Sequence, residues 1–261
     1  MKLEFFNAFE IPEPQRDQLF RKLHTLILLY FPRAPYQHFL DQYLYEGIEC
    51  CRGVLLKEGD NIRGFQLVAS MPVTLHGQKY TVLRSVVAKD REHNSRGSRS
   101  FERFGPRELI RQALRAHLQG REPWLIAQSA GPVTYLRLSR YFPAILPPTA
   151  LDADVPSELR ATFDGLADLC HMRTDHPEGW SMSEGPYYPI SDHELQSWKQ
   201  RPEPALRRFF KECPRAGQGQ VLVFAVPLTL TTLLSLGPRT ILTLLNKRRR
   251  ARHQTQASPQ N

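Results

Sequence analysis

Arginine and glycine residues gather in one polar segment, between an apolar run and an amphipathic run. The apolar run Arg84–Ala88 is typical of a strand, and a helix-like run begins near Pro106. Glycine lets the backbone approach a bound group, arginine binds phosphate in a bidentate manner, and a helix start offers free N–H groups. The pattern predicts a phosphate site, with a solvent-exposed basic loop as the alternative. The segment contains Arg91, Arg96, Gly97, Arg99, Arg103 and Gly105.

Other common cofactor and metal motifs are absent from the sequence. Neither the P-loop pattern Gly-x-x-x-x-Gly-Lys-Ser/Thr nor the dinucleotide pattern Gly-x-Gly-x-x-Gly occurs. His171, His176 and Glu184 match no metal-ligand spacing, so we expect no metal. Cysteines without Cys-x-x-Cys spacing predict neither a zinc site nor a disulfide framework. They are Cys50, Cys51, Cys170 and Cys213.

The charge of the chain is strongly positive and unevenly placed. The formal net charge is +9 and the isoelectric point is about 9.6, which suits an anionic partner. Residues 221–261 contain six basic residues and no acidic one, so the rest of the chain is only mildly basic. No interleaving of aromatic and basic residues is present, so a nucleic-acid surface is the least favoured partner.

The N-terminal segment does not read as a signal peptide. Glu4, Glu10 and Pro12 interrupt the apolar stretch that such a peptide requires. Together with the cysteine spacing, this predicts an intracellular, cytoplasmic protein with reduced thiols.

The hydrophobic pattern predicts a mixed α/β (α+β) domain. Helical spacing is expected over 12–31, 35–46, 106–120, 131–148, 154–170, 191–200 and 203–214, and strands over 51–59, 62–75, 79–88, 122–130 and 219–230. The first two strands meet at Gly59-Asp60-Asn61, which is good hairpin-turn material. This order predicts a mostly antiparallel central sheet with one parallel crossover, flanked by helices.

The same order of elements resembles the GNAT superfamily of N-acyltransferases. In that family the loop after the fourth core strand carries Arg/Gln-x-x-Gly-x-Gly/Ala and binds the pyrophosphate of acyl-CoA. The segment 79–88 would be that fourth strand, and Ser95–Ser100 is the nearest match to the motif. Gly97 is present there, while Arg99 or Ser100 stands in the second small position.

The resemblance extends to a second stretch, over 124–147. The family's fifth strand is followed by a helix with a Tyr and then Gly-Phe, and here Tyr141-Phe142 stands in that place after an earlier Tyr135. Residues 209–228 are similar to the last core strand, reached after an insertion. The resemblance covers roughly residues 1 to 150 and the strand near 221.

The resemblance implies where an acyl-CoA, such as acetyl-CoA, or an acyl-carrier protein would bind. The fourth and fifth strands would separate, and the backbone of Val86, Val87 and Ala88 would pair with the pantetheine arm. An amine would then attack the thioester directly, without a covalent enzyme intermediate. The residues implied for the pyrophosphate are Arg96, Gly97, Ser98, Arg99 and Ser100.

The resemblance also suggests catalytic groups. Tyr135 would protonate the leaving thiolate, with a core tyrosine as the alternative. The family often has a Glu on the fourth strand where this chain has Arg84 and Ser85, so the base is sought just past the strand, at Glu92 and His93. A solvated loop histidine is the alternative reading of His93.

We expect a single GNAT-like domain over 1–228, with 151–215 as an insertion that covers the substrate, and an apolar helix plus basic tail over 229–261. Basic residues in 239–252 would meet anionic lipid at the inner face of the membrane. The favoured function is acyl transfer from a thioester to a small-molecule or lipid-like amine. The alternative is a non-catalytic protein on the same fold that binds a membrane surface or an acidic partner through its tail.

Overall fold

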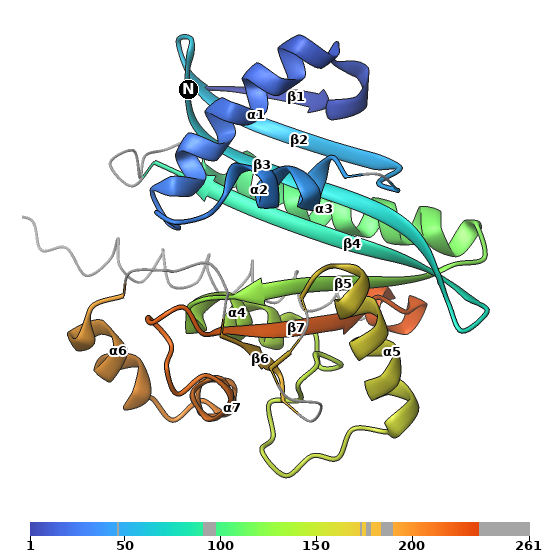
Figure 1. Ribbon diagram of the computed structural model, residues 1–261, viewed down its shortest axis with the longest axis vertical. Helices are drawn as coiled ribbons and strands as arrows, with labels where there is room; N and C mark the ends of the chain where they lie inside the picture. The colour runs from blue at the N-terminus through green and yellow to red at the C-terminus, as the bar shows by residue number, and fades with distance from the viewer. Residues whose placement is uncertain (46, 91–97, 173, 176–178, 184–189, 235–261) are drawn as a thin grey trace, which may run out of the picture.

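The computed structural model describes residues 1–45, 47–90, 98–172, 174–175, 179–183 and 190–234 (Figure 1). The described residues form a seven-stranded sheet with helices on both faces. Its strands are β1 (Lys2–Asn7), β2 (Cys50–Glu58), β3 (Asn61–Leu75), β4 (Gln78–Lys89), β5 (Glu122–Ser129), β6 (Ser181–Met182) and β7 (Val221–Pro227). The helices are α1 (Glu13–Leu28), α2 (Tyr36–Tyr43), α3 (Ser98–Leu118), α4 (Pro132–Tyr141), α5 (Ser157–Leu169), α6 (Asp192–Lys199) and α7 (Pro204–Glu212), with a short 3-10 turn at Ala8–Glu10.

The sheet is mixed and mostly antiparallel, as the sequence predicts. Its strand order is β1-β2-β3-β4-β5-β7-β6. Every neighbouring pair is antiparallel except β4 and β5, which are parallel and are connected through α3. A parallel neighbour needs a crossover of this kind, whereas the antiparallel β2, β3 and β4 need only tight turns.

Helices cover the two faces of β2–β4 separately (Figure 1). On β2, Cys51 and Leu55 pack in one cluster with the apolar residues of α1 and α2. Val54 and Leu56, which point to the other face, pack against Phe101 of α3. This is the alternation expected of a strand that is buried on both sides.

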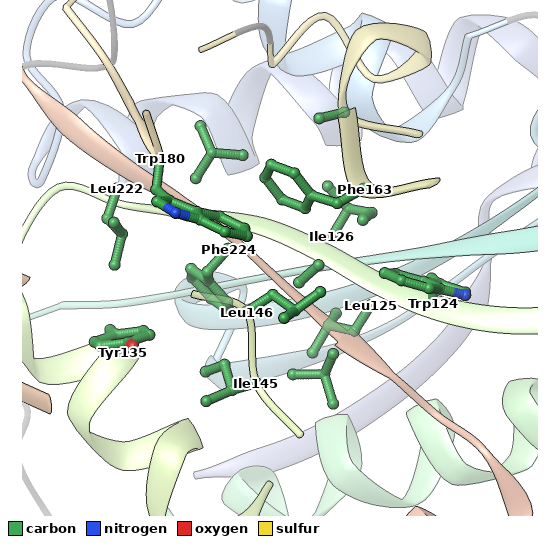
Figure 2. Close-up of a cluster of buried hydrophobic side chains, with 14 of the residues drawn as sticks. Trp124, Leu125, Ile126, Tyr135, Ile145, Leu146, Phe163, Trp180, Leu222 and Phe224 are labelled. Carbon is green, nitrogen blue, oxygen red and sulfur yellow. The ribbon is translucent and has the colours of Figure 1, made fainter. Parts of the chain in front are cut away.

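The second half of the sheet has its own core, on β5 and β7. Figure 2 shows Phe224 of β7 and Ile126 of β5 beside Phe163 and Trp180. The rings of Phe163 and Trp180 lie 4.7 Å apart between centroids. This core holds α5 and the segment before β6 against the strands, so part of the predicted insertion 151–215 is integrated into the sheet through β6.

Several features differ from the sequence prediction, among them the strand β6 and the shorter helix α4, and two of the differences have a clear physical reason. Strand β1 was not expected, because its charged residues are typical of a polar terminus. They suit an edge strand, where Glu4 forms an ion pair of 3.1 Å with Lys57 of β2.

The start of α3 at Ser98 is the second difference, because the sequence predicts a start near Pro106. Pro106 lies inside the helix. The helix extends in the N-terminal direction because Phe101 is buried against β2, which anchors the additional turns.

The expected tail helix lies mostly outside the described residues. Residues 230–234 are helical and lie just after β7. Residues 235–261, which include the basic run, lie outside the described residues. In the described part of the chain, no helix is long and apolar enough to cross a membrane.

Candidate functional site

Strands β4 and β5 pair over only part of their length. In the described part of the chain, their register runs from Tyr80 opposite Glu122 to Leu83 opposite Leu125. β4 then continues to Lys89 along β3, and β5 continues to Ser129 along β7. Figure 1 shows the two arrows diverging beyond this short pairing. The sheet therefore has an interior position at which two neighbouring strands present backbone edges to each other without pairing.

The backbone of β4 alternates between β3 and this gap. The N–H of Asp90 donates to the carbonyl oxygen of Arg63 at 2.7 Å, so the polar groups of Asp90 face β3. In an antiparallel pair, the backbone N–H and C=O groups of successive residues point to opposite sides of the strand. Because those of Asp90 point to β3, the backbone groups of Lys89, Val87 and Ser85 point to the gap. The Lys89 carbonyl accepts the Tyr30 hydroxyl. Of the three residues predicted to pair with a ligand, Val87 thus has its backbone groups on the gap side.

The side chains of the same three residues differ in burial. Ala88 is buried on the α1 side, Val86 is half-buried there, and Val87 is exposed. Val87 therefore combines an exposed side chain with backbone groups directed toward β5.

Helix α3 follows β4 in the chain, with eight residues, 90–97, between them. Ser98, Arg99 and Ser100, predicted to hold a pyrophosphate, form its first turn. The first turn of a helix carries N–H groups without intrahelical partners and favours an anion. Arg96, Gly97, Glu92 and His93 lie outside the described residues, so their predicted roles remain predictions.

The position of α3 is fixed by a contact with β3. The Gly105 N–H donates to Oε1 of the buried Gln66 at 2.8 Å. An added Cβ on Gly105 would lie 2.9 Å from the same oxygen, so only glycine fits without displacing Gln66. This contact sets the height of the helix over β3, close to the strand that borders the gap.

A cavity of about 150 Å³ lies under α2, on the face of β3 and β4 opposite α3. Its walls include His38 and Asp41 of α2, Arg84 of β4, and Cys170 and His171 at the end of α5. Arg84 is the first residue of β4 beyond the pairing with β5. The cavity therefore adjoins the point where the two strands separate.

Arg84 lines this cavity and is 7% exposed. Its Nη1 donates to the Cys170 carbonyl oxygen at 3.2 Å, and its Nη2 lies 3.9 Å from the sulfur of Met172. These contacts fasten the end of α5 to β4. Both acceptors are neutral, so the guanidinium charge is not compensated by them.

His38 is the titratable group on the α2 wall. Burial lowers the pKa of His38, and the nearby positive charge of Arg84 lowers it further, while Asp41 raises it. Its Nε2 lies 2.5 Å from Nε2 of Gln42. With the amide as donor, the ring is neutral and accepts at Nε2, and a turned amide would present its oxygen to a protonated ring. His38 is thus a neutral imidazole at pH 7 that can take up a proton.

Tyr45, His171 and the Cys170 thiol also line the cavity. Tyr45 and His171 form an edge-to-face pair with ring centroids 6.3 Å apart. Burial raises the pKa of the Cys170 thiol, so the sulfur stays protonated and is a poor nucleophile. The cavity therefore suits a base and a charged substrate better than covalent catalysis by cysteine.

Tyr135, predicted as the acid, lies on α4 in the core of the second half (Figure 2). It is fully buried and its hydroxyl donates to the Pro147 carbonyl oxygen at 2.6 Å. Burial raises the pKa of this phenol, so it remains protonated. It is not among the residues that line the cavity, and its catalytic role stays a prediction.

The sequence analysis did not identify the residues of α2 that line the cavity. His38, Asp41, Gln42 and Tyr45 recur at spacings of three and four residues, which place them on one side of a helix. That polar stripe, and an arginine midway along strand β4 between the apolar pairs Val82-Leu83 and Val86-Val87, are the signals that were available. Among the described residues, no group of His, Cys, Asp or Glu is arranged to hold a metal ion.

Comparisons with known proteins give distant similarities. No model of a known protein family matches the chain, and no curated protein matches it. Among solved structures, a protein from Enterococcus faecalis described as a probable N-acyltransferase is 14% identical. It is matched over 54% of this chain and 32% of its own length, with a TM-score of 0.35. The chain thus spans about a third of that protein.

Two further structures carry names of acetyltransferases. A ribosomal-protein-alanine N-acetyltransferase from Brucella melitensis is 12% identical, with 48% of this chain and 78% of that chain covered and a TM-score of 0.26. An aminoglycoside acetyltransferase from an uncultured soil metagenomic sample, in complex with sisomicin, is 15% identical. It covers 59% of this chain and 92% of its own, with a TM-score of 0.33.

Proposed function

We propose that the protein is an N-acyltransferase that moves an acyl group from a thioester to an amine. The donor, an acyl-CoA such as acetyl-CoA or an acyl-carrier protein, lies between β4 and β5 with its phosphates at the start of α3. The amine occupies the cavity under α2. The observation that carries this proposal is the separation of β4 from β5 after Leu83 and Leu125, beside both the helix start and the cavity.

The arrangement supports direct transfer. The amine nitrogen bonds to the thioester carbonyl carbon, the C–S bond breaks, and the thiolate leaves with the electron pair. One proton of the nitrogen is removed and one proton reaches the thiolate, so amide and free thiol are the products. Most of the rate enhancement then comes from holding the two reactants together, which in well-oriented systems is worth up to roughly 7–11 kcal/mol.

His38 is our candidate for the base among the described residues, beside the predicted Glu92 and His93, which lie outside them. It lines the cavity and is neutral at pH 7, because burial and Arg84 both lower its pKa. A general base contributes about 10²- to 10⁴-fold to the rate when it is in the correct protonation state. Arg84 cannot serve in this role, because a guanidinium does not give up its proton in proteins.

Calorimetric titration with acetyl-CoA and with a long-chain acyl-CoA tests the donor site. We expect micromolar binding that the Arg96→Ala/Arg99→Ala variant loses by roughly 100-fold, since each charge-assisted phosphate contact is worth about 1.5–3 kcal/mol. The matched control is Arg107→Ala/Arg115→Ala. These two exposed arginines lie about 14 and 26 Å along α3 from its first residue, Ser98. Loss of affinity in both variants, or no binding by the folded wild type, would contradict a CoA site at the helix start.

Release of free thiol in the presence of an amine tests catalysis. We expect the rate to fall as the pH drops below about 6.5, because protonated His38 is no longer a base and its pKa is lowered from that value. In the His38→Gln variant this acidic limb disappears and turnover falls by about 10²-fold or more. A second limb from the ionisation of the amine itself is shared by both proteins and serves as the internal reference.

A non-catalytic acyl-CoA binder is the second candidate. It is favoured by Arg84, which occupies β4 where the resemblance leads us to look for an acid. It predicts thioester binding with no thiol release for any amine, at any pH between 6 and 9.

The basic C-terminal tail is the part of the proposal that concerns the membrane. Six basic residues and no acidic residue lie in 235–261, so residues 1–234 carry only three of the nine net positive charges. Such a tail suits an anionic lipid surface, at about 1 kcal/mol for each basic residue near it. An acyltransferase held there would be close to lipid-like substrates.

A further inference from the structure

Arg84 is a buried positive charge without a negative partner in the described part of the chain. Its hydrogen-bonding partners are the carbonyl oxygen and thiol of Cys170 and the sulfur of Met172, all of them neutral. None of the ion pairs among the described residues includes Arg84. A buried charge is costly unless an opposite charge or a full set of hydrogen bonds compensates it. The cavity that it faces is the place where a compensating group would lie.

Another buried arginine among the described residues, Arg208, shows how such a charge is compensated. Arg208 is 6% exposed, close to the value for Arg84. Its Nη1 forms an ion pair of 3.1 Å with Glu212, and its Nε and Nη2 donate to the carbonyl oxygens of Pro148 and Ala150. The two arginines are buried to nearly the same extent. Arg208 has a carboxylate partner, whereas Arg84 borders an open cavity.

We propose that the cavity under α2 binds an acceptor that carries a carboxylate beside its amine, with the carboxylate on Arg84. Two N–H groups of a guanidinium match the two oxygens of a carboxylate, so this pairing is geometrically specific. The role of the amine in this inference rests on the proposed function. The binding of the carboxylate rests only on Arg84 and the cavity.

The opposite wall suits the amine. Asp41 lies on α2, where its Oδ1 accepts from the Gln37 amide at 2.7 Å and its charge is not paired with a described cation. An ammonium group near Asp41 would be stabilised, and His38 next to it would take the proton that the nitrogen must lose. Arg84 and Asp41 therefore present opposite charges on different walls of one cavity, which is complementary to a zwitterion.

The volume limits the size of the buried part. A dry cavity of about 150 Å³ in another protein holds benzene, which has six heavy atoms. Glycine and alanine have about that many, so the cavity accommodates the amino and carboxylate groups of a small amino acid. Any larger portion would extend past Tyr45 and His171 at the rim.

Binding without any acyl donor tests the inference independently of catalysis. The probes are glycine and L-alanine, their amides, and acetate and propionate, each followed by calorimetry and by the thermal midpoint of unfolding. We expect the amino acids to bind on the order of 100-fold more tightly than the amides, because the amide removes the charge that meets Arg84. Equal responses to acid and amide, or no response to any probe, would overturn the inference.

Two variants separate the ligand site from a merely structural arginine. Arg84→Gln should lose the preference for the acid over the amide, while its unfolding midpoint stays the same or rises, because an uncompensated buried charge is removed. Arg208→Gln should keep the preference and lower the midpoint, because Glu212 is left unpaired. A folded Arg84→Gln variant that still binds the amino acid more tightly than its amide would contradict the proposal.

Acyl transfer to the same probes distinguishes the two proposals. Thiol release with alaninamide as fast as with alanine, in wild type and in Arg84→Gln, would leave the acyltransferase intact and overturn the carboxylate site. Binding of alanine that depends on Arg84, with no thiol release from any acyl-CoA, would leave the site intact and overturn the acyltransferase.

Discussion

At the scale of single residues, Tyr135, predicted as a catalytic acid, is buried and connects two segments of the chain through a hydrogen bond. The Tyr135 hydroxyl donates to the Pro147 carbonyl oxygen at 2.6 Å, and its ring lies 6.2 Å from that of Phe224. The segment after Pro147 is held further by Arg208, which donates to the carbonyl oxygens of Pro148 and Ala150. The hydroxyl therefore has a partner and a structural task in the folded protein.

The Tyr135→Phe variant separates these roles. We expect it to lose about 1–3 kcal/mol of unfolding free energy, because a buried carbonyl loses its donor, and this is measured by urea denaturation. We also expect kcat to be unchanged at a temperature where the variant is folded. A fall of about 10²-fold in kcat with little loss of stability would instead support the acid role that the sequence predicts.

Residue types alone did not identify the cavity. His38, Asp41 and Gln42 share α2 with Phe39 and Tyr43, which are buried and also repeat at a spacing of four. The spacing predicts the helix and its buried side, but not what the neighbouring polar side meets. That depends on the end of α5, more than a hundred residues further along the chain, reaching Arg84.

At the scale of elements, the sequence predicts most of the sheet because each signal is local. The turn at Gly59 and Asp60, between β2 and β3, needs only the residues around it, and Gly59 has the positive φ of 57° that favours glycine. The apolar runs of β5 and β7 are equally clear. β1 could not be predicted in this way, since a charged edge strand is defined by its partner β2.

The start of α3 depends on a tertiary contact for the same reason. The sequence Phe104-Gly105-Pro106 is typical of a helix boundary. In the fold, the Gly105 N–H is taken up by Gln66 of β3, and Phe101 is buried against β2, so the helix extends to Ser98. A side chain from another element here overrides a local signal.

A double-mutant cycle at Gly105 and Gln66 tests this contact. Gly105→Ala should cost about 1–3 kcal/mol, because its Cβ would lie 2.9 Å from Gln66 Oε1 and would displace the hydrogen bond. Gln66→Ala removes the same bond and the obstructing atom. The double variant should therefore lose clearly less than the sum of the two single losses, as measured by urea denaturation. Additive losses would show that the two residues act independently.

At the scale of the whole molecule, the sheet consists of two parts joined by a short parallel pairing. β1–β4 pack with α1, α2 and part of α3, while β5–β7 pack with α4, α5 and α7. The joint is the register of Tyr80–Leu83 with Glu122–Leu125, strengthened by shared burial of Val82, Leu83 and Trp124. A ligand between β4 and β5 would lie directly beside this joint and touch both parts.

The distribution of charge gives the last prediction. The net charge of +9 divides into +3 on residues 1–234 and +6 on residues 235–261. We expect the protein to sediment with vesicles that contain anionic lipid and to stay in solution with neutral vesicles. At about 1 kcal/mol for each basic residue near the surface, replacing Lys247, Arg248, Arg249, Arg250 and Arg252 by Gln should abolish sedimentation.

The matched control for that experiment removes charge from the body. Exposed Arg103, Arg107 and Arg115 of α3 are replaced by Gln, and this variant should sediment like the wild type. Binding should also weaken between 50 mM and 500 mM salt, because the screening length shortens from more than 10 Å to a few Å. If the body variant loses binding and the tail variant keeps it, the membrane contact lies on α3. The tail would then have no part in it.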